Sequence, residues 1–549
     1  MQVCSPERPA VADQHFDVLV VGGGINGIAI ARECARGGKL TLVIDQNDFA
    51  SGTTSRSTRI IHGGLRYLEH GEISLVRESL RERERLLCQS PHLVRPMQFL
   101  LALSSGQRPF MRSSLAVRTG LWLYHKWAGG QRRISHSNEF ERQLDRGRAW
   151  SLYSYEDAQC EFPERLAAEW LTEAVAAGAM ARNYTRLLQI VHQNGHVTGA
   201  RLRDTLTGNE FEVSAAKIVN ASGPWADLVV NTSGLQVNKM VGGVRGAHLV
   251  LPRFSGISDT ALFTEATDGR PFFVIPWNGQ LLVGTTEVVD TGDPGETQPS
   301  SSEIDYLFDS FARLFPHSGL TKADIHYTFA GIRPLPFSPG KKMASVTRKH
   351  IIYDHVDDGL NGLLSVIGGK LTTALSVARE IARKLEIVVQ EPANIFAAPA
   401  PADGIESSFK HWARLVGCKA GIPESCAQSI ASWHGRRAMA IAQAASFNKK
   451  LRTPLCDHTC HIVAEAVEAV MHELAVTLGD ILLRRVPVAL GACWSESCSY
   501  QAANRIGCAL GWSEPRIYDE FDRFEQEREK FLHPGKDHVP QQPSAVVNG

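Results

Sequence analysis

The chain lacks the features that would mark it as secreted, membrane-spanning or nucleic-acid-binding. Among its 549 residues, Lys plus Arg and Asp plus Glu both total 58, so the overall charge gives no reason to expect a nucleic-acid partner. No stretch approaches the roughly 20 consecutive apolar residues that cross a bilayer. Residues 1–14 lack the basic start and apolar run of a secretory signal. We therefore expect a globular protein that is neither secreted nor transmembrane.

Cysteine is present but never as a Cys-x-x-Cys pair. The 11 cysteines are odd in number and scattered, which argues against a disulfide framework and favours a reducing, cytoplasmic location. The densest group contains Cys456, His458, Cys460 and His461. It lacks a second pair at the spacing of a structural zinc site and precedes an ordinary helical pattern. The sequence analysis therefore predicts no metal.

The N-terminal part alternates between strand and helix patterns. With 43% hydrophobic residues, the chain is long enough for two or three domains. Residues 16–21 (FDVLVV) form a buried-strand pattern, residues 25–36 a helical pattern, and residues 40–44 (LTLVI) a second strand. Strand, helix and strand in this order predict the opening of a doubly wound parallel sheet.

Between the first strand and the helix lies the glycine-rich turn at 22–27 (GGGING). Its first glycine allows a tight turn, the second lets the backbone approach a pyrophosphate, and the third lets the helix pack on the strand. Asp45, about 20 residues further on, ends the second strand and can accept hydrogen bonds from a ribose hydroxyl. This unit predicts dinucleotide binding, but it does not distinguish FAD from NAD.

The middle of the chain changes to short strands and hairpins. From 190 to 221, strands broken by turns such as Asn194-Gly195 predict an antiparallel meander that returns to the parallel sheet. A further hairpin pairs 272–277 with 281–284. We place it in a separate, mostly antiparallel substrate domain.

The remaining segments are mostly helical. Residues 74–88 carry opposite charges three apart, which is most simply explained by a helix with a solvated face. Residues 391–407, rich in Pro and Ala, predict a linker. Residues 408–533 are mostly helical, for example over 462–485, and residues 534–549 predict a disordered tail. The apolar stripe along 462–485 can face the main body or a second subunit, so a homodimer stays open.

Several blocks further along the chain occur in an order that is characteristic of one family. The chain resembles the FAD-dependent glycerol-3-phosphate dehydrogenase family from about residue 15 to 390, and more loosely to about 530. The blocks that carry the resemblance are 51–69 (SGTTSRSTRIIHGGLRYLE), 220–225 (NASGPW), 284–287 (GTTE), 331–335 (GIRPL) and 368–373 (GGKLTT).

The resemblance implies an α/β fold, α+β overall. A doubly wound FAD-binding domain over 15–390 would follow a flexible N-terminus at 1–14. An antiparallel substrate domain would be interleaved with it over about 85–175 and 235–335, and a helical domain would follow the linker. The reaction implied is oxidation of sn-glycerol 3-phosphate to dihydroxyacetone phosphate, with hydride leaving C2 for flavin N5 and electrons passing to a quinone.

The family motifs also imply which residues bind the cofactor. FAD would be bound by Gly22, Gly23, Gly24, Ile25, Asn26, Gly27, Asp45, Thr54, Ser55, Gly63, Gly64, Leu65, Ser222, Gly223, Gly331, Gly369, Lys370, Leu371 and Thr372.

On the substrate side, Arg66 and Arg333 are candidates for holding the phosphate or the C2 oxygen, because a guanidinium group matches phosphate oxygens in two-point geometry. Tyr67 would add a hydroxyl donor. His62, whose unperturbed pKa of about 6.5 suits a general base, is the expected catalytic base, unless it only orients its loop.

Lys370 and His248 complete the expected site. Lys370, beside two glycines, would place positive charge near the flavin or contact substrate; the alternative is a solvent-facing lysine at a helix start, which the helix dipole disfavours. His248 lies in another matching block and would contact substrate, although the same alternation fits an ordinary strand.

Two segments qualify the resemblance. Residues 107–133 mix Arg and Lys with Leu, Trp and Tyr, as expected for a helix in a membrane interface. This fits a peripheral enzyme on the inner face of the cytoplasmic membrane, although a buried amphipathic helix is the alternative.

Residues 161–168 (EFPERLAA) depart from the family pattern, retaining only Arg165 and Leu166, which puts local packing and substrate preference in doubt.

Three other functions compete with the quinone-linked dehydrogenase. An oxygen-using glycerol-3-phosphate oxidase would share the same site. An amino-acid or amine oxidase of the same fold must recognise a carboxylate and a neutral amine, for which the cationic group around Arg66 is less expected. A flavoprotein without turnover would have disabled substrate groups, whereas His62, Arg66, Arg333 and Lys370 are all present.

Overall fold

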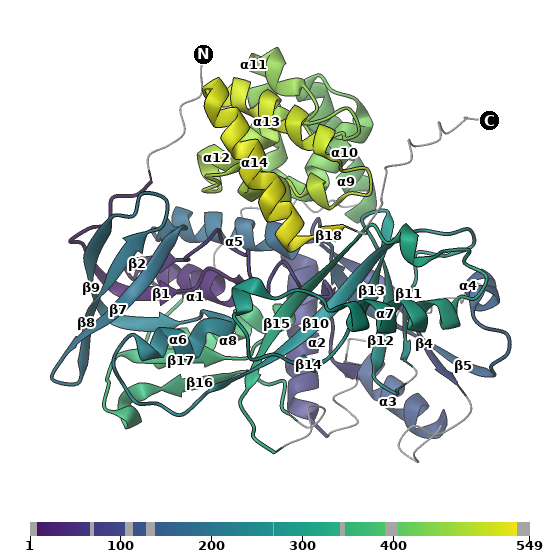
Figure 1. Cartoon of the computed structure of the whole chain (residues 1–549), viewed down its shortest axis with the longest axis horizontal. Coiled ribbons are helices and arrows are strands. Elements are labelled where there is room, and N and C mark those ends of the chain that lie inside the picture. Colours follow the sequence, from purple (N-terminus) through teal and green to yellow (C-terminus); the bar gives the residue numbers. More distant parts are fainter. Residues whose placement is uncertain are drawn as a thin grey trace.

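Two β-sheets and a helical domain make up the protein (Figure 1). The computed structural model describes residues 8–65, 71–104, 114–127, 138–266, 268–340, 346–389 and 405–534. In Figure 1 the sheets lie side by side, and the C-terminal helices cover them from above. This arrangement confirms the predicted fold class.

The first sheet contains the predicted dinucleotide-binding strands. Its strands are β1 (His15–Val21), β2 (Thr41–Ile44), β6 (Met180–Arg182), β7 (Thr185–Gln193), β8 (His196–Asp204), β9 (Glu210–Asn220), β16 (Ile351–Asp354) and β17 (Leu363–Ile367). They follow the order β16-β17-β9-β1-β2-β6, with β7 and β8 attached through β9. The pairs β1–β2, β1–β9, β9–β17 and β2–β6 are parallel, and β7–β8–β9 is the expected antiparallel meander.

Both faces of this sheet are buried, which explains why β1 is a continuous apolar run rather than an alternating one. Val18 and Val20 pack beneath helices α1 (Ile25–Arg36), α5 (Pro163–Ala176) and α8 (Ala374–Lys384). Leu19 and Val21 point to the other face, against the meander and the short helix α6 (Ala226–Asn231). The sheet is therefore rigid where β1 ends in the glycine-rich turn.

The second sheet is mostly antiparallel. It contains β3 (Ile60–Ile61), β4 (Val94–Ser104), β5 (Trp150–Cys160), β10 (Val241–Pro252), β11 (Ala261–Glu265), β12 (Pro271–Trp277), β13 (Gln280–Gly284), β14 (Val288–Val289), β15 (Tyr327–Pro336) and β18 (His533–Pro534). Only β11 and β4 pair in parallel among its described strands. The predicted hairpin is present as β12 and β13, which turn at Asn278-Gly279 with positive φ at both residues.

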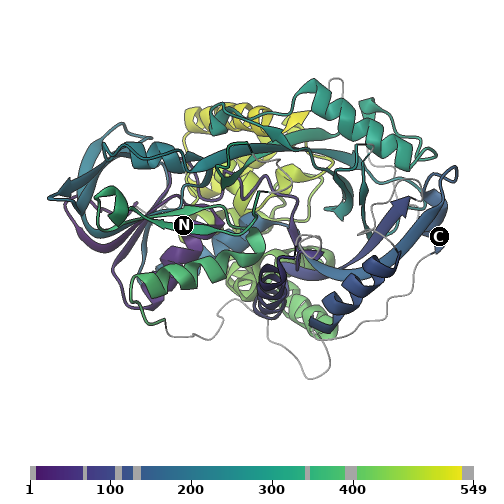
Figure 2. The ribbon, with the colours of Figure 1, turned by 90° about the horizontal axis from the view of Figure 1, so that it is seen from below.

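Helices cover the edges and faces of the second sheet. Figure 2 shows α7 (Ser301–Leu314) across its outer face and α3 (Ser114–Trp127) beside β4 and β5. Helix α7 begins at a capping box in which Ser300 and Glu303 satisfy each other's backbone N–H groups. The remaining helices of this part are α2 (Ile73–Gln89) and α4 (Asn138–Gln143).

The C-terminal domain is helical, as predicted. Its α-helices are α9 (Ile405–Ala420), α10 (Glu424–His434), α11 (Ala438–Phe447), α12 (Val463–His472), α13 (Glu496–Leu510) and α14 (Glu514–Phe531). This domain also contains the short helical segment η11 (Asp480–Arg485). Short helical turns outside it include η3 (Gly223–Trp225) and η8 (Leu371–Thr373). Within the described ranges, no helix combines the length and apolar character that a membrane crossing requires.

The single helix expected over 462–485 is in fact two elements. Helix α12 ends at His472, and the chain turns before η11. Leu474 adopts a positive φ of 60°, which an α-helix cannot include, and the carboxylate of Glu473 is fully buried against Arg165. Apolar periodicity continues across this break because both elements are buried, so periodicity alone could not reveal it.

The charge run on α2 is also less solvated than predicted. Glu82 and Arg83 are each 3% exposed. Arg83 donates to Asp157 at 2.9 Å, and Arg379 donates to Glu82 at 3.1 Å. These charges connect α2 to β5 and α8 instead of facing water.

The termini and the linker extend beyond the described ranges. Residues 8–14, expected to be flexible, pack on the first sheet, where Val11 is 1% exposed and Arg8 is paired with Asp204. Most of the predicted linker and tail lies outside the described residues. Residues 533–534, at the end of the described chain, pair with β15.

The segment 161–168, which departs from the family pattern, joins three parts of the molecule. Glu164 forms a two-point ion pair with Arg59, with distances of 2.7 and 2.9 Å. Its neighbour Arg165 pairs with Glu473 of the helical domain at 2.6 and 2.9 Å. All four side chains are almost completely buried, so the segment is well packed despite its unusual sequence.

We predict that Glu473→Gln destabilises the protein, because it leaves the buried Arg165 guanidinium without its compensating carboxylate. The expected loss is about 3–5 kcal/mol of unfolding free energy, measured by urea denaturation. Glu210→Gln, in the exposed pair with Arg203, is the matched control and should leave the midpoint almost unchanged. Equal midpoints for the two variants would contradict this role of the pair.

Candidate active site

A cavity of about 790 Å³ opens at the carboxyl ends of β1, β2 and β9. Its size falls within the upper range of ligand pockets. Ligands of open parallel sheets bind outside the carboxyl ends of the strands, so the cavity lies where the sequence placed the dinucleotide.

The glycine-rich turn forms the floor of this cavity. A Cβ on Gly27 would lie 1.8 Å from the carbonyl oxygen of Gly22, so only glycine allows α1 to approach β1 so closely. The backbone N–H of Ile25 donates to the Thr54 hydroxyl at 3.0 Å. The positive end of α1 therefore faces the cavity, as a pyrophosphate requires.

Asp45 lies at the end of β2 and lines the same cavity. One carboxylate oxygen accepts from the N–H of Gly23 at 2.7 Å and the other from the N–H of Asn47 at 2.9 Å. Burial raises the pKa of Asp45 to about 6. Near neutral pH the carboxylate is ionised and held in place as an acceptor for a ribose hydroxyl.

The loop before η8 approaches the glycine-rich turn from the other side. Asn26 donates to the carbonyl oxygen of Gly368 at 3.5 Å. Gly369 has φ of 93°, and a Cβ there would lie 2.7 Å from the Asn26 amide nitrogen. Two motifs more than 340 residues apart therefore meet at one end of the cavity, with Lys370 beside them.

Most of the residues expected to bind the cofactor line the cavity. Those that do are Gly22, Gly24, Ile25, Asn26, Asp45, Thr54, Ser55, Ser222, Gly223, Gly331, Gly369, Lys370 and Leu371. Gly23, Gly27, Gly63, Gly64, Leu65 and Thr372 are not among its lining residues. Gly23 and Gly27 instead shape the turn, and Thr372 accepts from the backbone N–H of His62 at 3.2 Å.

The helical domain also lines the cavity, which no sequence pattern predicted. Arg484, Arg523, Lys530 and Phe531 lie on its wall. The Arg56 guanidinium, from the first family block, lies 5.0 Å from the Phe531 ring. Burial lowers the pKa of Arg56 to about 10, so it remains a cation at neutral pH. No local pattern in α14 distinguishes these side chains from those of an ordinary surface helix.

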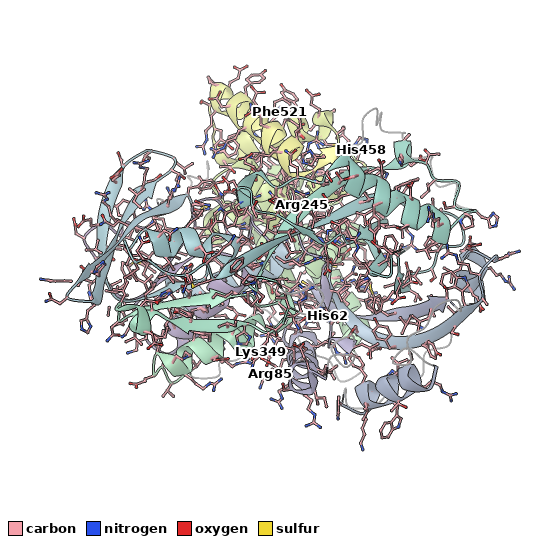
Figure 3. The ribbon with its side chains drawn as sticks, turned by 60° about the horizontal axis from the view of Figure 1, so that its bottom comes forward. His62, Arg85, Arg245, Lys349, His458 and Phe521 are labelled. Atoms are coloured by element: carbon pink, nitrogen blue, oxygen red, sulfur yellow. The ribbon has the colours of Figure 1, made fainter. Side chains whose placement is uncertain are left out.

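His62 directly follows strand β3, and Figure 3 labels its side chain. Burial, with a further contribution from the Lys370 cation, lowers the pKa of His62 to about 3. Its imidazole is therefore neutral at physiological pH and can accept a proton.

Lys370 has a similarly perturbed environment. Burial lowers its pKa to about 7, against the attraction of Glu72 and Glu78. Strongly perturbed titratable groups in a cleft are characteristic of functional sites. The structure thus brings the two predicted catalytic groups, His62 and Lys370, into electrostatic contact.

His248 and Arg333 lie on adjacent strands of the second sheet. The His248 ring stacks on Phe329 at 5.0 Å, and its Nε2 lies 3.0 Å from the Thr58 hydroxyl. Burial and the Arg333 cation lower the pKa of His248 to about 3. His248 is therefore a buried, neutral imidazole whose ring is oriented by Thr58 and Phe329.

Arg333 is positioned by the loop after β13. It donates to the Thr285 hydroxyl at 3.0 Å and to the Thr286 carbonyl at 3.3 Å, and Glu287 lies 3.7 Å away. Its neighbours Ile332 and Pro334 line the cavity. Arg333 therefore lies at the boundary between the cavity and the second sheet. Arg66 and Tyr67 fall outside the described residues.

Comparisons with known proteins agree with this geometry. A family model described as "FAD dependent oxidoreductase" matches residues 17–383. A second, described as "C-terminal domain of alpha-glycerophosphate oxidase", matches residues 371–517. Together they span residues 17–517, which include most of the cavity wall, most of the second sheet and most of the helical domain.

Two curated relatives cover nearly the whole chain. A glycerol-3-phosphate dehydrogenase from Synechocystis is 36% identical over 504 residues, which are 88% of this chain and 90% of the relative. An aerobic glycerol-3-phosphate dehydrogenase from Staphylococcus aureus is 30% identical over 502 residues, 86% and 87% of the two chains.

Solved structures share the fold. A glycerol-3-phosphate dehydrogenase from Bacillus halodurans complexed with FAD has a TM-score of 0.74 at 24% identity, covering 96% of this chain and 97% of that one. An L-α-glycerophosphate oxidase from Mycoplasma pneumoniae with FAD bound has a TM-score of 0.52 at 17% identity, covering 69% and 97%.

Fold, cavity and family model together define an FAD-dependent oxidoreductase. Within that class, the chain belongs to the FAD-dependent glycerol-3-phosphate dehydrogenase family, as its motifs predicted. FAD is its cofactor, and the glycine turn, Asp45 and the Gly369–Lys370 loop line the cavity at the carboxyl ends of the strands.

We predict that Asp45→Ala weakens FAD binding, because a hydrogen bond to a charged group contributes about 1.5–3 kcal/mol, equivalent to roughly 10–100-fold in the dissociation constant. Flavin fluorescence titration of the apoprotein measures this change. Asp17→Ala is a suitable control, since that carboxylate accepts from the N–H of Leu40 on the exposed side of β1. Wild-type affinity in Asp45→Ala would exclude a direct contact with the cofactor.

Proposed function

We propose that this protein oxidises sn-glycerol 3-phosphate to dihydroxyacetone phosphate. The supporting observation is the electrostatic contact between His62 and Lys370, which lines the FAD cavity, together with a second cation, Arg333, whose two chain neighbours line the same cavity. A substrate with a phosphate and a secondary alcohol needs cations, a base and a site for hydride transfer. The relatives' names indicate the same substrate.

The bound flavin would accept hydride from C2 at its N5. The remaining proton, on the C2 hydroxyl, is assigned to His62, because its imidazole is neutral at physiological pH and lies beside Lys370. As that imidazole gains a proton, the dianionic phosphate of the substrate would offset the repulsion from Lys370. His62 is therefore the proposed general base.

Lys370 is the proposed cation between the cofactor and the substrate. Its pKa of about 7 in this buried position means that nearby anions decide its protonation. Substrate phosphate would favour the ammonium form. A positive charge there also stabilises the electron-rich reduced flavin.

Arg333 is the proposed phosphate or C2-oxygen ligand. Its guanidinium is held by Thr285 and by the Thr286 carbonyl, so its orientation is fixed before substrate arrives. His248 would contact the substrate from the neighbouring strand. Arg66 and Tyr67 remain proposed contributors from the segment that follows His62.

A quinone is the proposed electron acceptor, with the protein at the inner face of the cytoplasmic membrane. Helix α3 supports this, because its Trp122 is 59% exposed and Lys126 lies 5.3 Å from the Trp122 ring. A tryptophan and lysine together on an exposed helix fit a lipid headgroup region. The C-terminal family model and the Mycoplasma structure favour an oxygen-using oxidase as the second candidate.

Anaerobic addition of glycerol 3-phosphate should bleach the visible absorbance of the FAD-loaded protein. Reoxidation then separates the acceptors: a soluble quinone should restore the absorbance rapidly, whereas oxygen should act slowly and release little hydrogen peroxide. Glycerol without phosphate serves as the control substrate. An oxidised spectrum in folded, FAD-loaded protein after addition of the phosphate ester would refute the proposed reaction.

The cationic role of Lys370 predicts a specific pH dependence. A group with pKa about 7 is protonated below that pH and neutral above it, so kcat/KM should fall as pH rises through neutrality. Lys370→Arg should retain activity to higher pH because guanidinium stays charged. Lys370→Met should lose about 100-fold in kcat/KM at pH 6.5. Its kcat/KM should not fall further as pH rises through neutrality.

The opposite pH dependence of kcat/KM would assign a different role to Lys370. If kcat/KM instead rises through neutral pH, and this rise disappears in Lys370→Met, Lys370 is the proton acceptor and not the cation. Lys217→Met is the matched control, since that lysine lies on the exposed part of β9 and donates to Asn361.

A further inference from the structure

The helical domain contains a cluster of thiols and an imidazole outside the flavin site. The Sγ atoms of Cys456 and Cys498 and a ring nitrogen of His458 all lie within 4.8 Å of one another. The His458 Nδ1 is 3.3 Å from the Cys498 Sγ. Within the described ranges, this is the one group of three such side chains whose ligand atoms converge so closely.

These separations match a zinc tetrahedron. Bonds of about 2.3 Å to sulfur and 2.0–2.1 Å to imidazole nitrogen place neighbouring ligand atoms about 3.5–3.8 Å apart. Both thiols are fully buried, whereas the imidazole lies at the surface. Metal can therefore enter from the His458 side, and the thiolates would be shielded from solvent and oxidants.

The backbone holds the ligands in two rigid pieces. Cys456 and His458 lie on a loop closed by an antiparallel bridge between Pro454 and Ile462, and the Leu455 N–H donates to the His461 carbonyl at 2.8 Å. Within this loop the Cys456 Sγ and a ring nitrogen of His458 lie within 4.8 Å of each other. The loop thus offers a thiol and an imidazole without a change of fold.

The other piece is the start of α13. Its N-cap Ser495 accepts from the Cys498 N–H, which places Cys498 in the first helical turn. The positive end of the helix dipole favours a thiolate there. Cys498 is therefore better suited to bind a cation than a cysteine in the middle of a helix.

A fourth ligand is available from Cys493. Its thiol lies 3.9 Å from the His458 carbonyl oxygen, and its own carbonyl oxygen lies 3.6 Å from the Cys498 Sγ. Cys493 is only partly exposed. Cys493 is therefore adjacent to both His458 and Cys498.

The local sequence could not reveal this set. Of the dense run that first resembles a metal site, Cys460 and His461 do not join it: His461 pairs with Glu465 at 2.8 Å and stacks on Trp433. The missing pair comes from 493–498, more than 30 residues away. The expectation of no metal rested on the absence of a nearby second pair.

We propose that Cys456, His458, Cys493 and Cys498 bind one structural Zn²⁺ ion. The alternative for two buried thiols is simple core packing, but that does not account for an imidazole nitrogen directed at the Cys498 sulfur. A closed Cys₃His set is a structural type, with no open position for catalysis. The ion would hold the 453–463 loop against α13.

The position of the site connects it to the flavin cavity. Helix α13 packs on α14 through Tyr500, whose ring lies 5.8 Å from Phe521 and 6.2 Å from Tyr518. Figure 3 shows His458 and Phe521 labelled on the same helical domain. Helix α14 then ends at Phe531, in the cavity wall. Metal bound at one end of the domain would thus stabilise the helix that closes the cofactor site.

The test begins with the full-length, FAD-loaded protein, produced with added zinc and purified without chelators. Elemental analysis should find about one zinc per chain. Growth with Co²⁺ should instead give the intense visible bands and sulfur-to-metal charge-transfer absorption of a tetrahedral cobalt–thiolate site. Removal of the metal should lower the Tm by several degrees, because a ligand that binds only the folded state stabilises it.

Single substitutions assign the ligands. Cys498→Ser and His458→Asn should lose most of the zinc and the cobalt charge-transfer band, and Cys493→Ser should weaken both. Cys508→Ser is the matched control, since this exposed cysteine lies on the same helix and should retain both. If the ligand variants do not fold, the cobalt spectrum of the unaltered protein still shows whether a metal–thiolate site is present.

Three results would overturn the inference. Protein without stoichiometric zinc and without a cobalt–thiolate spectrum has no such site. A Cys456–Cys498 disulfide in a non-reducing peptide map would assign these thiols to a covalent link instead. Unchanged zinc content and cobalt spectrum in Cys493→Ser would remove Cys493 from the ligand set.

Discussion

The structure depends on one buried carboxylate, that of Asp48. It follows the dinucleotide-binding strand β2, yet its two oxygens each accept from Arg485 at 2.8 Å, and Arg484 donates to it as well. Burial alone would raise the pKa of Asp48, but the two guanidinium groups hold it below its usual value. Removing Asp48 would take away the carboxylate that compensates the buried Arg485 guanidinium. The cofactor domain and the helical domain therefore cannot separate without a large energetic cost.

This constraint makes the cofactor site a product of the whole chain. Asp48 and Arg484 both lie on the cavity wall, so the ion cluster is also part of the flavin pocket. A second buried pair, Arg165 with Glu473, reinforces the same junction from α5. The helical domain is thus part of the cofactor site, because the end of α14, including Phe531, lines the cavity. Its own internal stability, including any bound metal, bears directly on cofactor binding.

Local patterns were sufficient where a function depends on a short segment. The turn at 22–27 and Asp45 are close in sequence and in space, so their spacing alone predicted the dinucleotide site. The block that contains Lys370 was found through a family motif, and the structure brings it against Asn26. The helix expected over 462–485 was wrong because a buried, apolar sequence continues across a turn in which Leu474 has a positive φ.

The sequence by itself determined the fold class, the family and the cofactor. Strand–helix periodicity and glycine spacing, which are local properties of the backbone, predicted the dinucleotide-binding sheet, and the motif blocks around His62, Arg333 and Lys370 identified the family and with it FAD. Only the tertiary structure decided which charges are buried, as for Arg83 on α2, and which distant residues meet, as for Cys456 and Cys498. It also decided the electrostatic state of the site, since burial lowers the pKa values of both His62 and Lys370, and the Lys370 cation lowers that of His62 further. Burial and long-range proximity depend on how the whole chain packs, and no short stretch of residues encodes them.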